Sequence, residues 1–266
     1  MKADEQLCTA VTGEDGTAIF EQNLPFGSYY IKELQAPDGF VSSDEIIEVT
    51  VSYQGQDVEV VRLKEIFKNQ PTTVEFRKSD LTTGVELDGA TLTVLDKDGN
   101  EIDKWTSVKG EPHIIKRLHV GETYILREEF APYGYLKAEE VEFTITDTAE
   151  IQKVEMKDDV PIGRIIINKK GEFLSEVSWN DMVAGAMDSI WGYVTGSLKD
   201  VTFEIYARED IKAADGESDD YYKKDELVAT IKTDELGIAR TDDLPLGKYY
   251  VVEKETADGF VLDGVI

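Results

Sequence analysis

Three glutamates stand out because each shares a predicted strand face with aromatic and aliphatic residues. Each ends an alternating run of three: Tyr29/Ile31/Glu33, Tyr124/Leu126/Glu128 and Tyr249/Val251/Glu253. Side chains two residues apart on a β-strand point to the same face of the sheet. A carboxyl group on an apolar face is costly to bury unless it is paired or has a chemical role. The pattern therefore marks Glu33, Glu128 and Glu253 as candidate functional residues.

Lys78 and Asp158 also continue apolar strand faces, before and after the strand of Glu128. The apolar residues that precede them at two-residue spacing are Val74 and Phe76, and Val154 and Met156. An amine and two carboxyl groups that all point inward are expensive to bury unless they neutralise one another. Removal from water favours the neutral amine and the neutral acid, which are a nucleophile and a proton donor. The set predicts either a buried ion-pair network or formation of an amide bond with loss of water or ammonia.

The three glutamates belong to a longer repeated segment, which sets the organisation of the chain. Each copy runs from a tyrosine-containing strand into a turn that ends in glycine and an aromatic residue: Gly39-Phe40, Gly134-Tyr135 and Gly259-Phe260. The glutamates lie roughly 95 and 125 residues apart, a spacing typical of domains and too long for solenoid units. We therefore predict three similar domains in tandem, at residues 1–70, 71–160 and 161–266.

The alignment of the copies predicts that only the middle domain is complete. Residues 4–39 align with residues 225–259, but a long stretch of the same domain precedes the third copy only. Conversely, two more strand-like runs follow the first copy and none follows the third. We expect residues 1–70 to be the carboxy-terminal part of a domain and residues 161–266 to be a domain without its last strand or strands.

The middle region alternates apolar and polar residues in one run after another, a pattern of period two that indicates β-strands. Asp98-Gly99 is a hairpin signal, and the turn residues of Ala131-Pro132-Tyr133-Gly134 separate two further runs. No helical stripe is present in this region. The predicted fold class is all-β, a tandem array of small antiparallel β-sandwiches.

Residues 175–196 are predicted to be an exception, a short helix inserted between the first two strands of the third domain. Ser178 is a candidate helix cap, although Gly185 and Gly192 weaken helical propensity. We expect this amphipathic helix to cover one side of the sheet rather than to dock on a partner or a lipid surface. The apolar residues at helical offsets of three and four are Trp179, Val183, Ala186, Met187, Ile190, Trp191 and Val194.

Composition narrows the classes of partner and cofactor. The sequence has 55 acidic and 28 basic residues and a net charge of −27, which argues against nucleic acid and anionic membrane partners. Cys8, the single cysteine, cannot form an intramolecular disulfide, and no apolar run is long enough to span a membrane. His113 and His119 come without cysteine ligands, so we expect no metal site. We expect no other cofactor, because no nucleotide-binding motif is present.

At these residues the sequence resembles the Cna-B/SpaA-type prealbumin-like domains of Gram-positive surface adhesins and pilins. The segments that carry the resemblance are VEFRKSDLTTG from residue 74, LDGATLTVLDKDG from residue 87 and GETYILREEFAPYGY from residue 121. In that family a first-strand lysine links to a last-strand asparagine or aspartate, and a glutamate promotes the reaction. The resemblance implies that Lys78 is the nucleophile, Asp158 the acceptor and Glu128 the proton shuttle. The adjacent Asp159 is the alternative acceptor.

The resemblance implies partial sets of the same residues in the outer domains. Glu33 and Asn69 match the glutamate and the acceptor of the first domain, whose lysine would lie upstream of the sequence. Lys169 and Glu253 match the lysine and the glutamate of the third domain, with Lys170 as the alternative nucleophile. The acceptor of that domain would lie beyond the last residue. We therefore expect no bond to close within either outer domain of this sequence.

The resemblance implies a structural protein without enzymatic activity beyond its own cross-linking. The expected role is a stalk segment of an adhesin or pilin, outside the cell and anchored to the cell wall, with intramolecular isopeptide bonds. Expected partners are host extracellular matrix or neighbouring pilin subunits, without membrane insertion of this segment. The alternative is a surface module that binds a host matrix protein or a glycan, for which Trp105 and Trp191 are candidate contacts if exposed. A hydrolase is disfavoured, because the glutamates lie on core faces.

Overall fold

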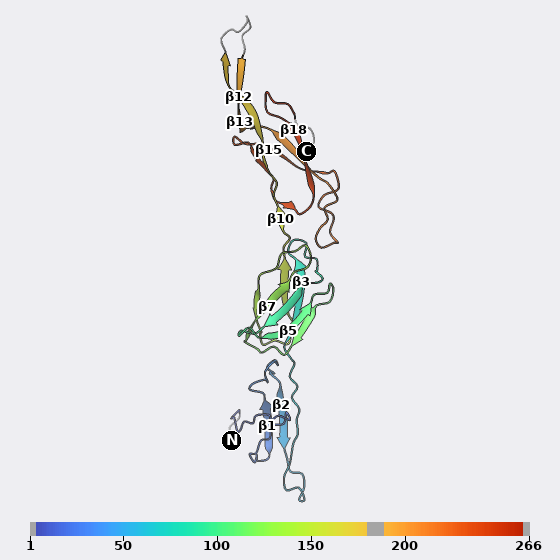
Figure 1. Cartoon of the computed structure of the whole chain (residues 1–266). Coiled ribbons are helices and arrows are strands. Elements are labelled where there is room, and N and C mark those ends of the chain that lie inside the picture. Colours follow the sequence, from blue (N-terminus) through green and yellow to red (C-terminus); the bar gives the residue numbers. More distant parts are fainter. Residues whose placement is uncertain (1–3, 180–188, 263–266) are drawn as a thin grey trace. The chain divides into compact units, whose positions relative to one another are not determined.

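The computed structural model describes residues 4–179 and 189–262 of the chain (Figure 1). Every regular element in these residues is a β-strand, and most of the neighbouring strand pairs are antiparallel. This confirms the prediction of an all-β fold. No helix able to cross a membrane occurs in the described residues. The chain forms two compact units, of which one comprises Met1–Val74, Ile114–Thr123 and Thr144–Gln152 and the other Glu75–His113, Tyr124–Phe143 and Lys153–Ile266.

The first repeat contains one two-stranded antiparallel sheet. Strand β1 (Gly27–Lys32) pairs with β2 (Ile46–Val51). Tyr29 lies opposite Val49 and Ile31 opposite Ile47, so aromatic and aliphatic residues gather on one face while the residues between them are exposed. The tyrosine hydroxyl of Tyr29 donates a 2.7 Å hydrogen bond to the carbonyl of Pro25 at the start of the strand.

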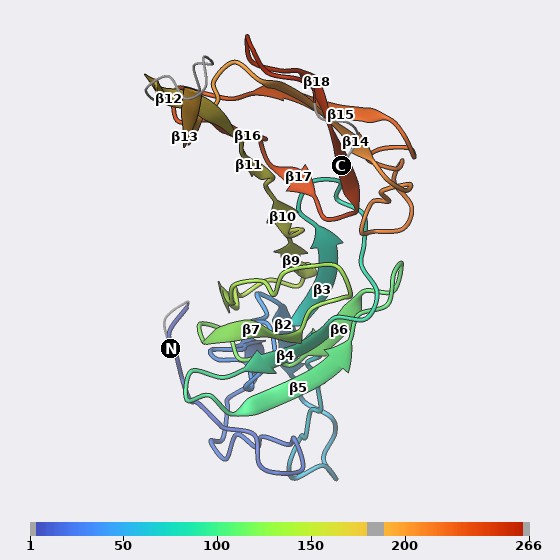
Figure 2. The same ribbon diagram turned by 45° about the horizontal axis from the view of Figure 1, so that its top comes forward.

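The middle repeat is a sandwich of two sheets with strand orders β6-β3-β9 and β5-β4-β7-β8. Figure 2 shows β4 between β5 and β7 in the larger sheet. Burial alternates along β3, β7 and β9, because most of their inward residues are apolar and their neighbours face outward. The strands are β3 (Thr73–Asp80), β4 (Thr91–Leu95), β5 (Glu101–Thr106), β6 (His113–Lys116), β7 (Thr123–Phe130), β8 (Val141–Thr144) and β9 (Gln152–Asp158). Their buried apolar residues include Val74, Phe76, Leu92, Val94, Tyr124, Leu126, Val154 and Met156.

The third repeat is built around a three-stranded sheet of order β15-β14-β18, with three smaller two-stranded pairings. Leu198, Val201 and Phe203 form a buried apolar cluster against which Phe260 packs. The strands of the main sheet are β14 (Thr202–Ala207), β15 (Leu227–Lys232) and β18 (Tyr249–Glu255). The smaller pairings join β10 (Ile162–Gly163) to β17 (Leu244–Pro245), β11 (Ile166–Asn168) to β16 (Ile238–Arg240), and β12 (Lys170–Trp179) to β13 (Ser189–Ser197). The division into three domains at the residues given above stays a prediction.

The predicted helix over residues 175–196 is wrong for the part of it that the structure describes. Residues 175–179 belong to β12 and residues 189–196 to β13, which pair with each other, while residues 180–188 lie outside the described residues. The expected cap Ser178 is a strand residue opposite Ile190. Two glycines explain the difference, because each weakens a helix by about 1 kcal/mol and makes room across the hairpin. A Cβ at Gly196 would lie 2.8 Å from Cε2 of Phe173, and one at Gly192 would lie 3.0 Å from Cγ of Glu176.

Truncation of the buried core is expected to destabilise the middle repeat. Leu126 has 0% of its surface exposed, so Leu126→Ala leaves a cavity and lowers the free energy of unfolding by about 2–5 kcal/mol. The measurement is chemical denaturation followed by Trp105 fluorescence, in a background of Trp179→Phe and Trp191→Phe. The matched control Leu136→Ala truncates a leucine that is 50% exposed, and its effect should stay within about 0.5 kcal/mol. Equal effects of the two substitutions would contradict the assigned core.

Candidate functional site

The structure brings Lys78, Glu128 and Asp158 together in the interior of the middle repeat. Lys78 Nζ lies 3.1 Å from Glu128 Oε1 and donates a hydrogen bond to Asp158 Oδ1. All three side chains have 0% exposed surface. Each reaches the interior by the alternation that also buries its apolar neighbours, so the inward direction follows from the two-residue period of the strands.

The sandwich positions the three groups from both of its sheets. Lys78 lies near the end of β3 and Asp158 at the end of β9, which are neighbouring strands of one sheet. The backbone N–H of Leu81 donates to the carbonyl of Asp158 at 2.8 Å, which holds the two strand ends side by side. Glu128 comes from β7 of the other sheet. Its carboxyl group therefore meets the lysine across the core.

The carboxyl group of Glu128 is fixed in orientation by a backbone donor. The N–H of Ala138 donates a 2.7 Å hydrogen bond to Oε2, which leaves Oε1 directed at the lysine. Asp158 Oδ2 is a buried oxygen for which no hydrogen-bond donor is found among the described residues, whereas Glu128 Oε1 faces Lys78 Nζ in an ion pair at 3.1 Å without a well-aligned hydrogen bond. Buried polar atoms are usually satisfied, so a proton held by one carboxyl group is the simplest donor for this pair.

The charges of the site point to the same shared proton. One ammonium and two carboxylates sum to a net negative charge inside a dry core, and one added proton makes the set neutral. Burial raises the pKa of Asp158 to about 6, against the lowering influence of Lys78 and with a further increase from the charge of Glu128. A neutral carboxyl group is a better electrophile than a carboxylate, because its hydroxyl can leave as water. The site can therefore hold an amine, an acceptor acid and a proton carrier in contact.

The geometry distinguishes Asp158 from its neighbour Asp159. The side chain of Asp159 is exposed, and its Oδ1 accepts a hydrogen bond from the backbone N–H of Val160 at 2.8 Å. The two aspartates point to opposite faces because they are adjacent on the chain. Only Asp158 lies beside Lys78.

In the first repeat, Glu33 and Asn69 are in direct contact. The side-chain amide of Asn69 donates to both carboxylate oxygens of Glu33, at 3.0 and 2.8 Å. It also donates to the carbonyl of Val41 at 3.3 Å, and the N–H of Ser43 donates to Glu33 Oε2 at 3.1 Å. The pair is half-buried. The structure thus joins the glutamate and the acceptor that the sequence matched to each other.

In the third repeat, Lys169 and Glu253 form the corresponding ion pair. Lys169 Nζ lies 2.8 Å from Glu253 Oε2, and the side chains are 18% and 0% exposed. Glu253 Oε1 is a buried oxygen for which no hydrogen-bond donor is found among the described residues. The alternative nucleophile Lys170 is exposed. The structure therefore pairs Lys169 with the glutamate.

Asp80 is a residue near the site that the sequence reasoning did not single out. It is buried, and its Oδ1 accepts the N–H groups of Thr82 and Thr83 while its Oδ2 accepts the hydroxyl of Tyr135 at 2.8 Å. Burial alone would raise the pKa of Asp80, but the hydrogen bonds from Thr83, Tyr135 and Thr82 hold it below its usual value. The sequence could have indicated Asp80, because it lies two residues after Lys78 and continues the alternation of Val74, Phe76 and Lys78.

His113 packs on an aromatic ring and not on the three residues of the site. His113 stacks on Trp105 with ring centroids 4.1 Å apart, and its Nε2 lies 2.8 Å from Asp103 Oδ2. This arrangement packs Trp105 against the core residue Phe76, at 5.3 Å between ring centroids. Within the described residues, no group of three or more metal-ligating side chains is found.

Comparison with known proteins shows the family of the chain. A family model described as the SpaA prealbumin-like fold domain matches residues 1–65, 72–160 and 193–266. No curated protein matches the sequence.

Several solved structures resemble the chain. The Bacillus anthracis TIE protein is 26% identical over 96% of this chain and 41% of its own, with a TM-score of 0.49. The chain thus spans about two fifths of that protein's length. A streptococcal ancillary pilin is 15% identical over 91% of this chain and 71% of its own, with a TM-score of 0.31. BcpA, the major pilin subunit of Bacillus cereus, is 12% identical over 68% of this chain and 87% of its own, with a TM-score of 0.31.

Removal of the buried ammonium is expected to make the stability of the middle repeat depend on pH. In Lys78→Met two buried carboxyl groups lose their cation, which lowers the free energy of unfolding by about 3–5 kcal/mol at pH 8. The pKa of Asp158 is already raised to about 6 by burial, and the substitution removes the influence that lowers it. A raised folded-state pKa stabilises the fold fully below about pH 4 and loses that effect as the pH rises through about 6 and above.

The measurement is urea denaturation of Lys78→Met at pH 5 and pH 8, with the exposed-site variant Lys104→Met as the control. Lys78→Met should be closer to its parent at pH 5 than at pH 8, and the control should match its parent at both. A deficit that is the same at the two pH values would show that the carboxyl groups are hydrated in the variant.

Proposed function

Because the chain belongs to the SpaA family of prealbumin-like fold domains, we propose that it is a structural stalk segment of a cell-surface adhesin or pilin. In this proposal an isopeptide bond forms between Lys78 and Asp158 without an external enzyme, and Glu128 promotes it. The observation that carries the proposal is the buried contact of one amine with two carboxyl groups, at the ends of two neighbouring strands.

The proposed reaction joins Lys78 Nζ to Asp158 Cγ. The ammonium first gives a proton to a carboxylate, and Glu128 Oε1 is placed to accept it at 3.1 Å. The neutral amine attacks Cγ, and as the C–N bond forms the nitrogen passes a second proton to a carboxylate oxygen of Asp158, which becomes a hydroxyl group. The hydroxyl group of the acceptor leaves with a proton that Glu128 returns. One ammonium and one carboxylate thus become one amide and one water, with no oxidant or cofactor.

Burial of the reactants supports this reaction in two ways. The three side chains are held in contact before any chemistry, which removes most of the entropic barrier of a bimolecular reaction. The product amide is neutral, whereas the reactants keep charge in a core where charge is costly. Formation of the bond therefore removes a destabilising feature of the unreacted fold.

The position of the bond supports a mechanical role. It would connect the first strand of the middle repeat with the last, since β3 and β9 are neighbours in one sheet. Tension applied to the two ends of this repeat would then pass through the amide, and the strands between residues 78 and 158 would carry little load. By analogy with a disulfide, closing a loop of about 80 residues would also stabilise the fold by on the order of 4 kcal/mol.

We propose the same chemistry for the pairs in the outer repeats. Glu33 would promote a bond to Asn69, with loss of ammonia, and Glu253 would promote a bond from Lys169. Each contact supplies two of the three groups, at 2.8 to 3.0 Å. The proposed location is the outside of a Gram-positive cell, attached to its wall, and the proposed partners are neighbouring pilin subunits.

The alternative function, binding of a host matrix protein or a glycan, has less support from the described residues. Trp105 was one candidate contact, but its ring is half-buried and packs between His113 and Phe76. The side chain of Trp191 lies outside the described part of the structure. The proposal therefore remains a structural role.

The proposed bond changes the mass of the chain, which provides a direct test. The denatured wild-type chain should be lighter than its sequence mass by one water, and a tryptic peptide pair should join residues 78 and 158. Glu128→Ala should keep the full sequence mass, and so should the nearly isosteric Glu128→Gln. Intact-mass spectrometry under denaturing conditions measures the difference, and circular dichroism verifies that the variants fold.

The matched control is Glu129→Ala, which removes the adjacent carboxylate from the opposite face of β7 and should keep the loss of one water. If the wild-type chain has the full sequence mass, Lys78, Glu128 and Asp158 form an ion-pair network only. If the folded Glu128 variants also lose a water, the assigned role of Glu128 is wrong.

A further inference from the structure

We propose that the glycine-aromatic turn is, in the first two repeated segments, a docking element for the adjoining repeat, and that its first copy forms a stiff, backbone-locked joint. The surface that it meets consists of Thr72, Arg117, Leu118 and Asp147 of the middle repeat, and this set is called the joint surface below. The inference does not depend on the isopeptide chemistry. It concerns how neighbouring repeats are held to each other.

Gly39 is the residue on which the joint depends most. It is buried and has a φ of +81°, a backbone conformation that favours glycine. A Cβ at this position would lie 2.6 Å from the carbonyl oxygen of Arg117 and 2.9 Å from its carbonyl carbon. The obstacle is backbone, so it cannot move aside as the end of a flexible side chain could. The turn of the first repeat therefore packs directly on the main chain of the middle repeat.

Backbone hydrogen bonds fix this contact through Thr72. The N–H of Thr72 donates to the carbonyl of Gly39 at 3.0 Å, and the N–H of Arg117 donates to the carbonyl of Thr72 at 3.0 Å. The Thr72 hydroxyl donates to the carbonyl of Leu118 at 2.6 Å, and the residue has 0% exposed surface. One buried peptide thus links the turn of the first repeat to the loop after β6.

Side chains close the same joint from two sides. The Arg117 guanidinium lies over the Phe40 ring, 5.1 Å from its centroid, which is within the range of a cation–π contact. Arg117 has a φ of +67°, uncommon for a residue with a Cβ. Ser42 also binds Asp147: its side chain and its N–H, the latter donating to Asp147 Oδ1 at 2.9 Å, hold the pKa of Asp147 below its usual value.

The compact units agree with this description. Residues 114–123 contain Arg117 and Leu118 of the joint surface, and residues 144–152 contain Asp147. Both segments belong to the same compact unit as the first repeat and not to the unit that holds the rest of the middle repeat. A flexible linker would show few contacts across it. The interlocked backbone groups instead predict that the first repeat and this end of the middle repeat move together.

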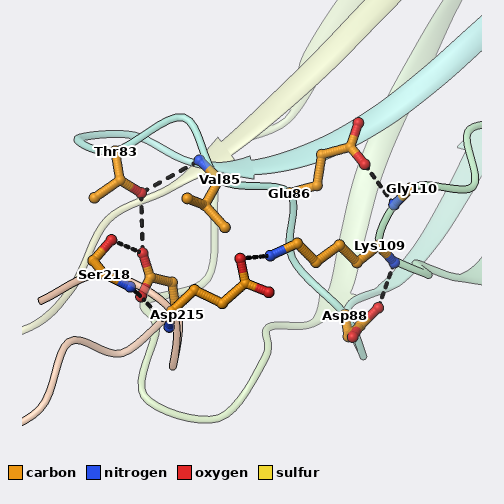
Figure 3. A network of polar contacts seen from close by, with 9 residues as sticks. Thr83, Val85, Glu86, Asp88, Lys109, Gly110, Asp215 and Ser218 are labelled. Atoms are coloured by element: carbon orange, nitrogen blue, oxygen red, sulfur yellow. Dashed lines mark hydrogen bonds and ion pairs between the residues drawn. The ribbon is translucent and has the colours of Figure 1, made fainter.

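The second copy of the turn also lies against the next repeat, and the polar contacts around it come from side chains of neighbouring loops. A Cβ at Gly134 would lie 3.4 Å from Cβ of Ala214, in ordinary contact. Figure 3 shows the surrounding network, in which Thr83 Oγ1 donates to Asp215 Oδ2 at 3.3 Å and Lys109 pairs with Glu217. Contacts between exposed charges are weakened by salt. The two copies therefore share a docking role and differ in stiffness.

The test measures the distribution of distances across the first joint. Spin labels are attached to Glu48→Cys on β2 and Glu150→Cys in the segment of residues 144–152 that carries Asp147, both exposed positions of the same compact unit, in a Cys8→Ser background, and pulsed electron resonance gives the distances. The intact chain should show one narrow peak that is unchanged by added salt. Gly39→Ala should lose that narrow peak, because the turn can no longer seat on Arg117.

The matched control is Gly99→Ala, which places alanine at a similar φ of +84° where nothing lies within 4 Å of its Cβ. It introduces the same kind of backbone strain without a clash and should keep the narrow peak. A broad or salt-dependent distribution in the unmutated chain overturns the proposal. So does a folded Gly39→Ala variant with the narrow peak of its parent. If Gly39→Ala does not fold, the width and the salt dependence of the distance distribution in the unmutated chain still decide whether the joint is stiff.

Discussion

The burial of one ammonium with two carboxyl groups is the constraint on which the middle repeat depends. Lys78, Glu128 and Asp158 have no exposed surface, so their charges must be neutralised within the core. Separately, each would be costly enough to disturb the sandwich. In contact, their charges neutralise one another. The strands that carry them must therefore pair in the register that brings the three side chains together.

That register links local chemistry to the architecture of the sheet. β3 and β9 must end side by side so that the amine and the acceptor touch, and β7 must bring Glu128 across the core. The apolar residues before each polar one fill the interior and exclude water. A dry interior raises the pKa of Asp158 and keeps a proton available where an amide could form. Packing and reactivity thus have the same physical origin.

The repeated turn connects this core to its surroundings. In its first copy it leads from Glu33, directly after β1, to Gly39, whose missing side chain permits contact with the Arg117 backbone. In the next copy it leads from the strand of Glu128 to Tyr135, whose hydroxyl binds Asp80 two residues beyond Lys78. The same short segment therefore follows a glutamate in both copies and reaches a place where contacts with another repeat are made.

The sequence by itself determined which side chains face inward, because alternation along a strand is a local property. Tyr124/Leu126/Glu128 and Val74/Phe76/Lys78 needed no knowledge of the fold. The family and its all-β class followed from the same segments. Only the tertiary structure decided which groups meet: Asp158 and not Asp159, Lys169 and not Lys170, and the N–H of Ala138 on Glu128. The helix predicted over residues 175–196 was wrong for the same reason: their apolar spacing is compatible with a helix, and only tertiary contacts decide against it. The contact that favours the hairpin, Phe173 over Gly196, joins residues far apart along the chain.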